Sequence, residues 1–235
     1  MNSTKMTPYS LLMALSTIGA LLVGIVALRY SYNSLSVIES GLGFLVLVTV
    51  TGSLWLYHNR RSHHTNSAER NGIMLFGIAL GLLWVIEISI NNFIAPPLPA
   101  RDIIDNIFWA VIASSILVFS VIRAFQKDSL IRGIEVGIWS GFISGLLACC
   151  MGLIVIVFGM HFILQDPLNI AEWAGHAASI TAPTMAAYFA FETLAGAFGH
   201  LIILGVFMGG LLGILGGSIG KGIKRVSNML RYHAE

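Results

Sequence analysis

The segments GIEVGIWSGFISG (residues 133–145) and GVFMGGLLGILGG (residues 205–217) decide the fold that this sequence predicts. Each repeats glycine at every fourth position inside a long apolar run. The two glycine ladders are Gly133, Gly137, Gly141 and Gly145 in the first segment, and Gly205, Gly209, Gly213 and Gly217 in the second. In a helix this spacing forms a stripe without side chains, so two membrane helices can approach until their backbones touch. The ladders therefore predict that the last two membrane spans pack together as a helical hairpin.

The composition indicates a protein of the lipid bilayer. Hydrophobic residues make up 56% of the chain and charged residues 10%, whereas soluble domains carry about 25% charged residues. The polar gaps between apolar runs are short, so residues 1–235 are interpreted as a single membrane-embedded domain. The first run is longer than the core of a signal peptide and is interpreted as a retained transmembrane helix.

Six apolar runs reach the roughly 20 residues that a spanning helix requires. We place them near residues 10–29, 37–57, 72–94, 103–123, 133–163 and 194–220. An unbroken helix over the fifth run exceeds the thickness of a bilayer and has to tilt or protrude.

Lysine and arginine residues concentrate in alternate gaps between these runs. Of the 13 cations, 11 fall at the N-terminus, in the second and fourth loops and at the C-terminus, which leaves Arg29 and Arg101 on the other side. The positive-inside rule then places both termini in the cytoplasm. The predicted fold class is all-α: a polytopic, multi-pass bundle of six transmembrane helices in the cell membrane.

The connection between the fifth and sixth spans predicts additional helices. Asp166 and Pro167 form a good helix start, because the acid suits the cap position and proline suits the first helical position. We expect an interfacial helix near 167–180 and a half-helix near 183–196 that ends before the true sixth span. Together they predict a short extracellular helical cap or a re-entrant hairpin.

Acidic and histidine side chains gather on the predicted outer side. Glu87 lies within an apolar run, where an ionisable group is costly and marks a functional site, and Asn91 follows one turn later on the same face. Glu192 and His200, two turns apart, are expected to join them in a proton or cation path. Pro96, Pro97 and Pro99 make a short turn, after which Asp102 is expected to cap the fourth helix, with Asp105 in its first turn.

Glu172 and His176, four residues apart, form a candidate metal pair. A tight site needs three or four ligands, and no second paired motif is present in the sequence. Cys149 and Cys150 are interpreted as buried packing residues, because adjacent cysteines make a strained bridge and apolar surroundings keep thiols inert. No cofactor is expected, since phosphate-binding loops, nucleophile elbows, kinase motifs and redox motifs are missing from the sequence.

Two functions fit these features. The first is a non-catalytic, permease-like transport component that moves a small solute, an ion or a lipid-like substrate. The layout of six spans, both termini inside and a helical cap before the last span is similar to that of the membrane subunits of ABC-2-type exporters, although no family motif matches residue by residue. The alternative is a membrane scaffold, assembly or sensory subunit without transport activity. An enzyme is the third reading, and it rests only on the outer acids and histidines.

The expected partners follow from the same features. They are the lipid bilayer, a cytoplasmic ATPase or another membrane subunit, and a second copy of the chain. Nucleic acid is excluded because the sequence offers no aqueous basic face.

Overall fold

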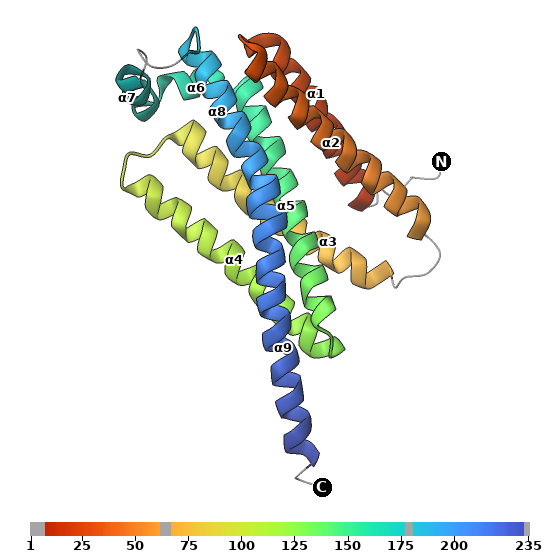
Figure 1. The fold of residues 1–235 in the computed structure, drawn as a ribbon. Coiled ribbons are helices and arrows are strands. Elements are labelled where there is room, and N and C mark those ends of the chain that lie inside the picture. The colour runs from red at the N-terminus through yellow and green to blue at the C-terminus, as the bar shows by residue number, and fades with distance from the viewer. Residues whose placement is uncertain (1–7, 62–66, 177–180, 233–235) are drawn as a thin grey trace, which may run out of the picture.

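The computed structural model describes residues 8–61, 67–176 and 181–232, and every regular element within these ranges is a helix (Figure 1). Two of the elements are π-helices, written η. The elements in chain order are α1 (Pro8–Tyr30), α2 (Ser34–Arg61), α3 (Ser67–Ser89), η1 (Ile90–Ile94), α4 (Ala100–Lys127), α5 (Leu130–Phe158), α6 (Met160–Gln165), α7 (Pro167–His176), α8 (Met185–Gly199), η2 (His200–Met208) and α9 (Gly209–Tyr232).

Six helices among the described residues are long and apolar enough to cross a membrane, as the sequence predicts. They cover Tyr9–Tyr30, Ser34–Leu56, Asn71–Ile94, Ala100–Lys127, Leu130–Phe158 and Met185–Arg231. Large apolar side chains are exposed on the outside of the bundle, which is the surface that lipid would cover. These features are consistent with an integral membrane protein. The side of the membrane that each terminus faces stays a prediction.

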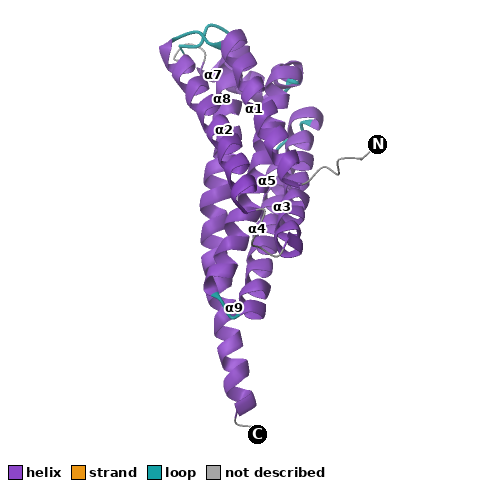
Figure 2. Ribbon diagram, turned by 90° about the vertical axis from the view of Figure 1, so that its right-hand side faces the viewer, coloured by secondary structure: helices purple, strands orange, loops and turns teal. Residues whose placement is uncertain are grey.

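Helix α5 is the centre of the bundle. In the most apolar 18-residue stretch of α5, 72% of the residues are buried. The corresponding stretch of each of the other five spans is at most 44% buried. It packs against α1, α3, α4, α8, η2 and α9. Figure 2 shows that α9 then extends beyond the other helices toward the C-terminus.

The two glycine ladders lie against each other, with α5 on one side and η2 and α9 on the other. A β-carbon added to Gly145 would lie 2.6 Å from the carbonyl oxygen of His200, and one added to Gly209 would lie 2.6 Å from that of Gly137. Contacts this short leave no room for a side chain. The obstacle in each case is backbone, which cannot rotate away, so glycine is the residue that permits this approach.

A second glycine stripe on α9 faces α4. A β-carbon on Gly216 would lie 2.7 Å from the carbonyl oxygen of Leu117, and one on Gly220 would lie 2.9 Å from the β-carbon of Ala124. Helix α9 is therefore fitted closely between two neighbours, α4 and α5, within the same chain. Further glycines on α3 extend the pattern, since a β-carbon on Gly77 would meet the Ile143 side chain at 2.8 Å.

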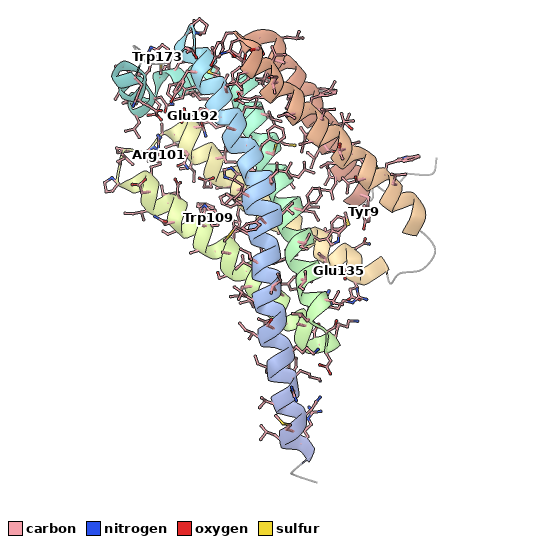
Figure 3. The ribbon with its side chains drawn as sticks, in the orientation of Figure 1. Tyr9, Arg101, Trp109, Glu135, Trp173 and Glu192 are labelled. Carbon is pink, nitrogen blue, oxygen red and sulfur yellow. The ribbon has the colours of Figure 1, made fainter. Side chains whose placement is uncertain are left out.

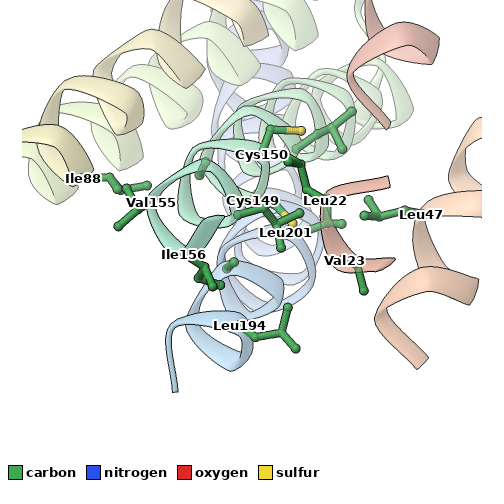
Figure 4. Close-up of a cluster of buried hydrophobic side chains, with 14 of the residues drawn as sticks. Leu22, Val23, Leu47, Ile88, Cys149, Cys150, Val155, Ile156, Leu194 and Leu201 are labelled. Carbon is green, nitrogen blue, oxygen red and sulfur yellow. The ribbon is translucent and has the colours of Figure 1, made fainter. Parts of the chain in front are cut away.

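Both cysteines belong to the hydrophobic core. Cys149 is fully buried and Cys150 is 4% exposed, among residues such as Leu22, Val23 and Leu201 (Figure 4). Both are free thiols. Their expected role as packing residues agrees with this placement.

The fifth span is shorter than the sequence suggests. We expected one helix over 133–163, but α5 ends at Phe158 and the short helix α6 follows Gly159. The amide of Gly159 bonds to the carbonyl of Val155 at 2.8 Å, and a β-carbon there would lie 3.0 Å from the ring of Phe93. The β-carbon would also lie 2.9 Å from the backbone oxygen of Val155, so glycine suits the junction between α5 and α6.

The sixth span is longer than the sequence suggests and is continuous. We expected a half-helix near 183–196 to end before a new span at 194–220, yet α8, η2 and α9 follow one another without a turn. The backbone of Gly199 and His200 stays in the right-handed helical region. In lipid each backbone amide and carbonyl requires a partner, so an apolar run favours a continuous helix over a break.

Two smaller predictions concern helix starts. Helix α7 begins at Pro167 after Asp166, as expected, while residues 177–180 of the predicted interfacial helix lie outside the described residues. Helix α4 begins at Ala100, so Asp102 lies in its first turn and does not cap it. The helix begins three residues too early for Asp102 to occupy the cap position, which Pro99 takes instead.

Candidate functional site: a polar cavity at one end of the bundle

A cavity of about 300 Å³ opens at the end of the bundle that carries α6 and α7, which we call the cavity end. Its lining includes all four residues of the predicted polar cluster, namely Glu87, Asn91, Glu192 and His200. They come from α3, η1, α8 and η2. In Figure 3, Arg101 and Glu192 lie at this end near Trp173 of α7, while Glu135 lies near the other end. The structure thus brings together side chains that are far apart in the sequence.

Glu87 is one of two deeply buried acids of this cavity, the other being Asp166. The residue exposure of Glu87 is 7%, although it carries a carboxyl group. The side-chain amide of Asn91 donates to Oε1 of Glu87 at 2.6 Å and to Oδ1 of Asp105 at 2.6 Å. The amide therefore joins two carboxyl groups from α3 and α4. Glu87 and Asn91 share a face as the sequence predicts, but the part played by Asp105 was not foreseen.

Two acceptor atoms of this group have no hydrogen-bond partner among the described residues. They are Oε2 of Glu87 and Oδ1 of Asn91, and both are buried. A buried acceptor without a donor costs roughly 1–3 kcal/mol, more when it is charged. The group formed by Glu87, Asn91 and Asp105 therefore has more acceptors than donors.

An ion pair joins α4 to the turn between α6 and α7. Nη2 of Arg101 lies 2.7 Å from Oδ2 of Asp166, and their side chains are 16% and 6% exposed. The other oxygen of Asp166 accepts from the amide of Leu168 at 3.0 Å, which caps α7. Both residues line the cavity. The sequence indicated the cap but gave no sign of the arginine, which is 65 residues away.

The candidate metal pair is engaged in other contacts. Oε1 of Glu172 accepts a hydrogen bond from the hydroxyl of Tyr188 at 2.8 Å, and Nδ1 of His176 lies 3.0 Å from the backbone carbonyl of Glu172. Trp173 also packs on Tyr188, with ring centroids 5.9 Å apart. Within the described residues, no group of three or more histidine, cysteine, aspartate or glutamate side chains could hold a metal ion. Glu172 lines the cavity and helps to dock α7 on α8.

His200 lines the cavity and contacts α3 and α8. Its ring meets that of Trp84 edge to face at 4.9 Å, and Nδ1 lies 2.9 Å from the carbonyl oxygen of Gly196. His200 is also the first residue of η2, while Asn91 lies in η1. Both π-helical segments therefore border the cavity. Such segments are rare and occur frequently at functional sites, and the sequence pattern carried no sign of them.

The opposite half of the bundle contains the glycine ladders, and we call it the ladder end. The cavity extends as far as Ala148, Gly152 and Ala197. Gly145, which packs against the backbone of His200, is not part of the lining and belongs to the ladder end. The hydroxyl groups of Ser140 and Ser144 bond to carbonyls of their own helix at 2.7 and 2.9 Å. In the part of the chain that the structure describes, the charged pairs of this half lie near helix ends, as between Arg132 and Glu135 at 2.6 Å.

The cavity is acidic. Four carboxyl groups line it, from Glu87, Asp166, Glu172 and Glu192, against the single guanidinium of Arg101. The field of such a cavity attracts cations and repels anions.

In comparisons with known proteins, no family model matches the chain, and neither a curated protein nor a solved structure matches it.

Proposed function

We propose that the chain is a non-catalytic, permease-like transport component whose cavity admits a small polar solute or an ion. The observation that carries this proposal is the cavity itself. It lies among membrane-spanning helices and is lined by Glu87, Asn91, Glu192 and His200, which come from four separate elements. Glu87 is buried, and buried ionisable groups in membrane proteins are expensive and mark the routes of substrates, ions and protons.

The size of the cavity supports the same proposal. A volume of about 300 Å³ lies at the lower limit of pockets that bind small molecules, roughly 300–1,000 Å³. The mixture of carboxyl, amide and imidazole groups suits a small polar or cationic substrate better than a lipid tail. A scaffold whose only task is to hold helices together has no need of a carboxyl group buried as deeply as Glu87.

Transport requires a second state in which the ladder end opens. In the present state the cavity is accessible from one end, and the backbones of α5 and α9 close the other. The glycine ladders suit such a change, because smooth backbone surfaces can slide past each other without unlocking side chains. A rocking motion of α8, η2 and α9 against α5 would expose the cavity from the opposite side, as alternating access demands.

The scaffold remains the second candidate, and the observation in its favour is the ladder end. Helix α9 contacts α4 and α5 through glycines on two faces, an arrangement suited to permanent docking. The C-terminal turns of α9 extend beyond the bundle and expose Ile223, Val226 and Leu230. A partner, whether a cytoplasmic ATPase, another membrane subunit or a second copy, would find apolar surface there.

Cysteine labelling distinguishes transport from a static scaffold without knowledge of the substrate. The native cysteines are buried, and their thiols are therefore inert toward a water-soluble maleimide. Thr193, which lines the cavity, is replaced by cysteine. Labelling is measured with a membrane-impermeant maleimide in sealed vesicles of both orientations. We expect Thr193→Cys to react from both sides of the membrane, since each state exposes the cavity to one of them.

The matched control is Glu135→Cys at the ladder end, which should react from one side only. Reaction of Thr193→Cys from a single side, opposite to that of Glu135→Cys, would contradict transport and favour the scaffold. The unsubstituted chain reports any background reaction of Cys149 and Cys150.

A further inference from the structure

The group of Glu87, Asn91 and Asp105 has a shortage of hydrogen-bond donors. The two carboxyl groups and the amide oxygen provide five acceptor atoms, and only the two amide hydrogens of Asn91 are available to them within the group. Both of these hydrogens are used, one toward each acid. Oε2 of Glu87 and Oδ1 of Asn91 are left buried without a donor.

The two acids also lie close together, because each accepts a hydrogen bond from the same amide nitrogen of Asn91 at 2.6 Å. Two carboxylates that share a buried site repel each other, and in such pairs one proton is commonly retained between them. The only guanidinium in the cavity lining, that of Arg101, is paired with Asp166. No charge of opposite sign in the lining is therefore free to neutralise Glu87 and Asp105.

One proton removes the shortage. When Oε2 of Glu87 carries hydrogen, that atom becomes a donor within a group whose other oxygens, on Asp105 and Asn91, are acceptors. The carboxylic acid and the amide can then pair in both directions, because Oε1 of Glu87 already accepts from the same amide. The proton comes from cavity water and returns to it, and no other bond forms or breaks.

We propose that Glu87 holds a proton at the base of the cavity, stabilised by Asn91 and Asp105, and that this proton is an ion that the cavity takes up and releases. The inference rests on the proposed function, because a bound proton drives transport only in a transporter. The other titratable or charged groups of the lining are His200 on η2, Glu192 on α8, Glu172 on α7 and the pair of Arg101 and Asp166. Helix α5 contributes Ala148 and Gly152 to the lining, which do not titrate.

Infrared spectroscopy of the full chain in lipid at neutral pH tests this inference directly. A protonated carboxyl group has a carbonyl stretching band that is separate from the carboxylate bands. We expect the unsubstituted chain to show this band and Glu87→Gln to lose it. Glutamine preserves the pairing with Asn91, since its amide donates where the protonated acid did, so the fold should be retained. The matched control, Glu135→Gln at the ladder end, should keep the band.

Three results would overturn the proton site. They are a missing band in the unsubstituted chain, a band that persists in Glu87→Gln, and a band that sodium chloride abolishes while choline chloride does not. The last result would assign the site to an alkali cation. Should Glu87→Gln fail to fold, Asp105→Asn provides a second test, because loss of the neighbouring charge should change the pH at which the band disappears; an unchanged pH would count against the site.

The infrared test and the labelling test fail independently. A band combined with labelling of Thr193→Cys from one side only would leave the proton site in place and overturn transport. Labelling from both sides without a band would do the reverse.

Discussion

Helices pack around α5 in different ways at the two ends of the bundle. At the ladder end, glycines on α5 and α9 bring backbones together, and Ser140 and Ser144 bond within their own helix. At the cavity end, polar side chains from several helices face a shared space, and Oε2 of Glu87 is left without a donor. The comparison teaches that one half of the bundle is held by close backbone contact, whereas the helices of the other half surround a polar cavity.

The largest effect is expected from filling the glycine contact at the ladder end. Gly213→Leu puts a side chain where a β-carbon would already lie 3.0 Å from the backbone of Ile134. Overpacking a core costs about 1–3 kcal/mol when side chains can adjust. Here backbone is the obstacle, so we expect a loss of more than about 3 kcal/mol in the free energy of unfolding, measured by denaturation in lipid-detergent micelles.

Gly222→Leu is the matched control on the same helix. A β-carbon on Gly222 meets nothing within 4 Å. The free energy of unfolding of this variant should therefore differ from that of the unsubstituted chain by no more than about 0.5 kcal/mol. Equal stability of the two leucine variants would break the comparison, because the ladder would then not hold the two helices.

A smaller effect is expected from breaking the ion pair at the cavity end. Arg101→Ala leaves Asp166 6% exposed and without its cation. Breaking a buried pair costs about 3–5 kcal/mol, and we expect a value near about 3 kcal/mol because water in the cavity can solvate the remaining charge. Thermal and chemical unfolding of the variant would measure the loss.

The same substitution at the ladder end sharpens the contrast. Arg132 pairs with Glu135 three residues later on the helix surface, and its side chain is 48% exposed. Exposed pairs contribute less than about 1 kcal/mol. If Arg132→Ala destabilised the chain as much as Arg101→Ala, burial would not be the reason for the difference.

The smallest effect is expected where α7 docks on α8. Tyr188→Phe removes the hydroxyl that donates to Glu172 but keeps the ring that packs on Trp173. A net loss of about 1 kcal/mol is typical for one hydrogen bond. Tyr32→Phe is the control, since the ring of Tyr32 packs edge-on against Phe191 through contacts that this change preserves. A loss in Tyr188→Phe no greater than in the control would show that the hydroxyl contributes nothing to docking.

The sequence was informative where a feature depends on neighbouring residues in the chain. Pro96, Pro97 and Pro99 predicted a turn, and Asp166 with Pro167 predicted the start of α7, because caps and turns follow from local backbone chemistry. Glu87 was identified because an acid within an apolar run is costly wherever the run folds. The structure pairs Asn91 with Asp105, and Asp166 with Arg101. These partners depend on which helices meet, and the local sequence does not indicate that.

The residues of this chain determined by themselves that it forms six apolar helices, that two of them carry glycine stripes and that one carries a buried acid. The reason is that a helix in lipid has to satisfy its own backbone hydrogen bonds and present a long apolar surface. Both requirements depend only on the residues of that helix. Only the tertiary structure decided which faces meet, that α8, η2 and α9 form one continuous helix, and that Glu87 and Asn91 share one cavity with Glu192 and His200. Lipid is as apolar as the interior of the bundle, so an apolar side chain looks the same in sequence whether it faces a neighbouring helix or the membrane.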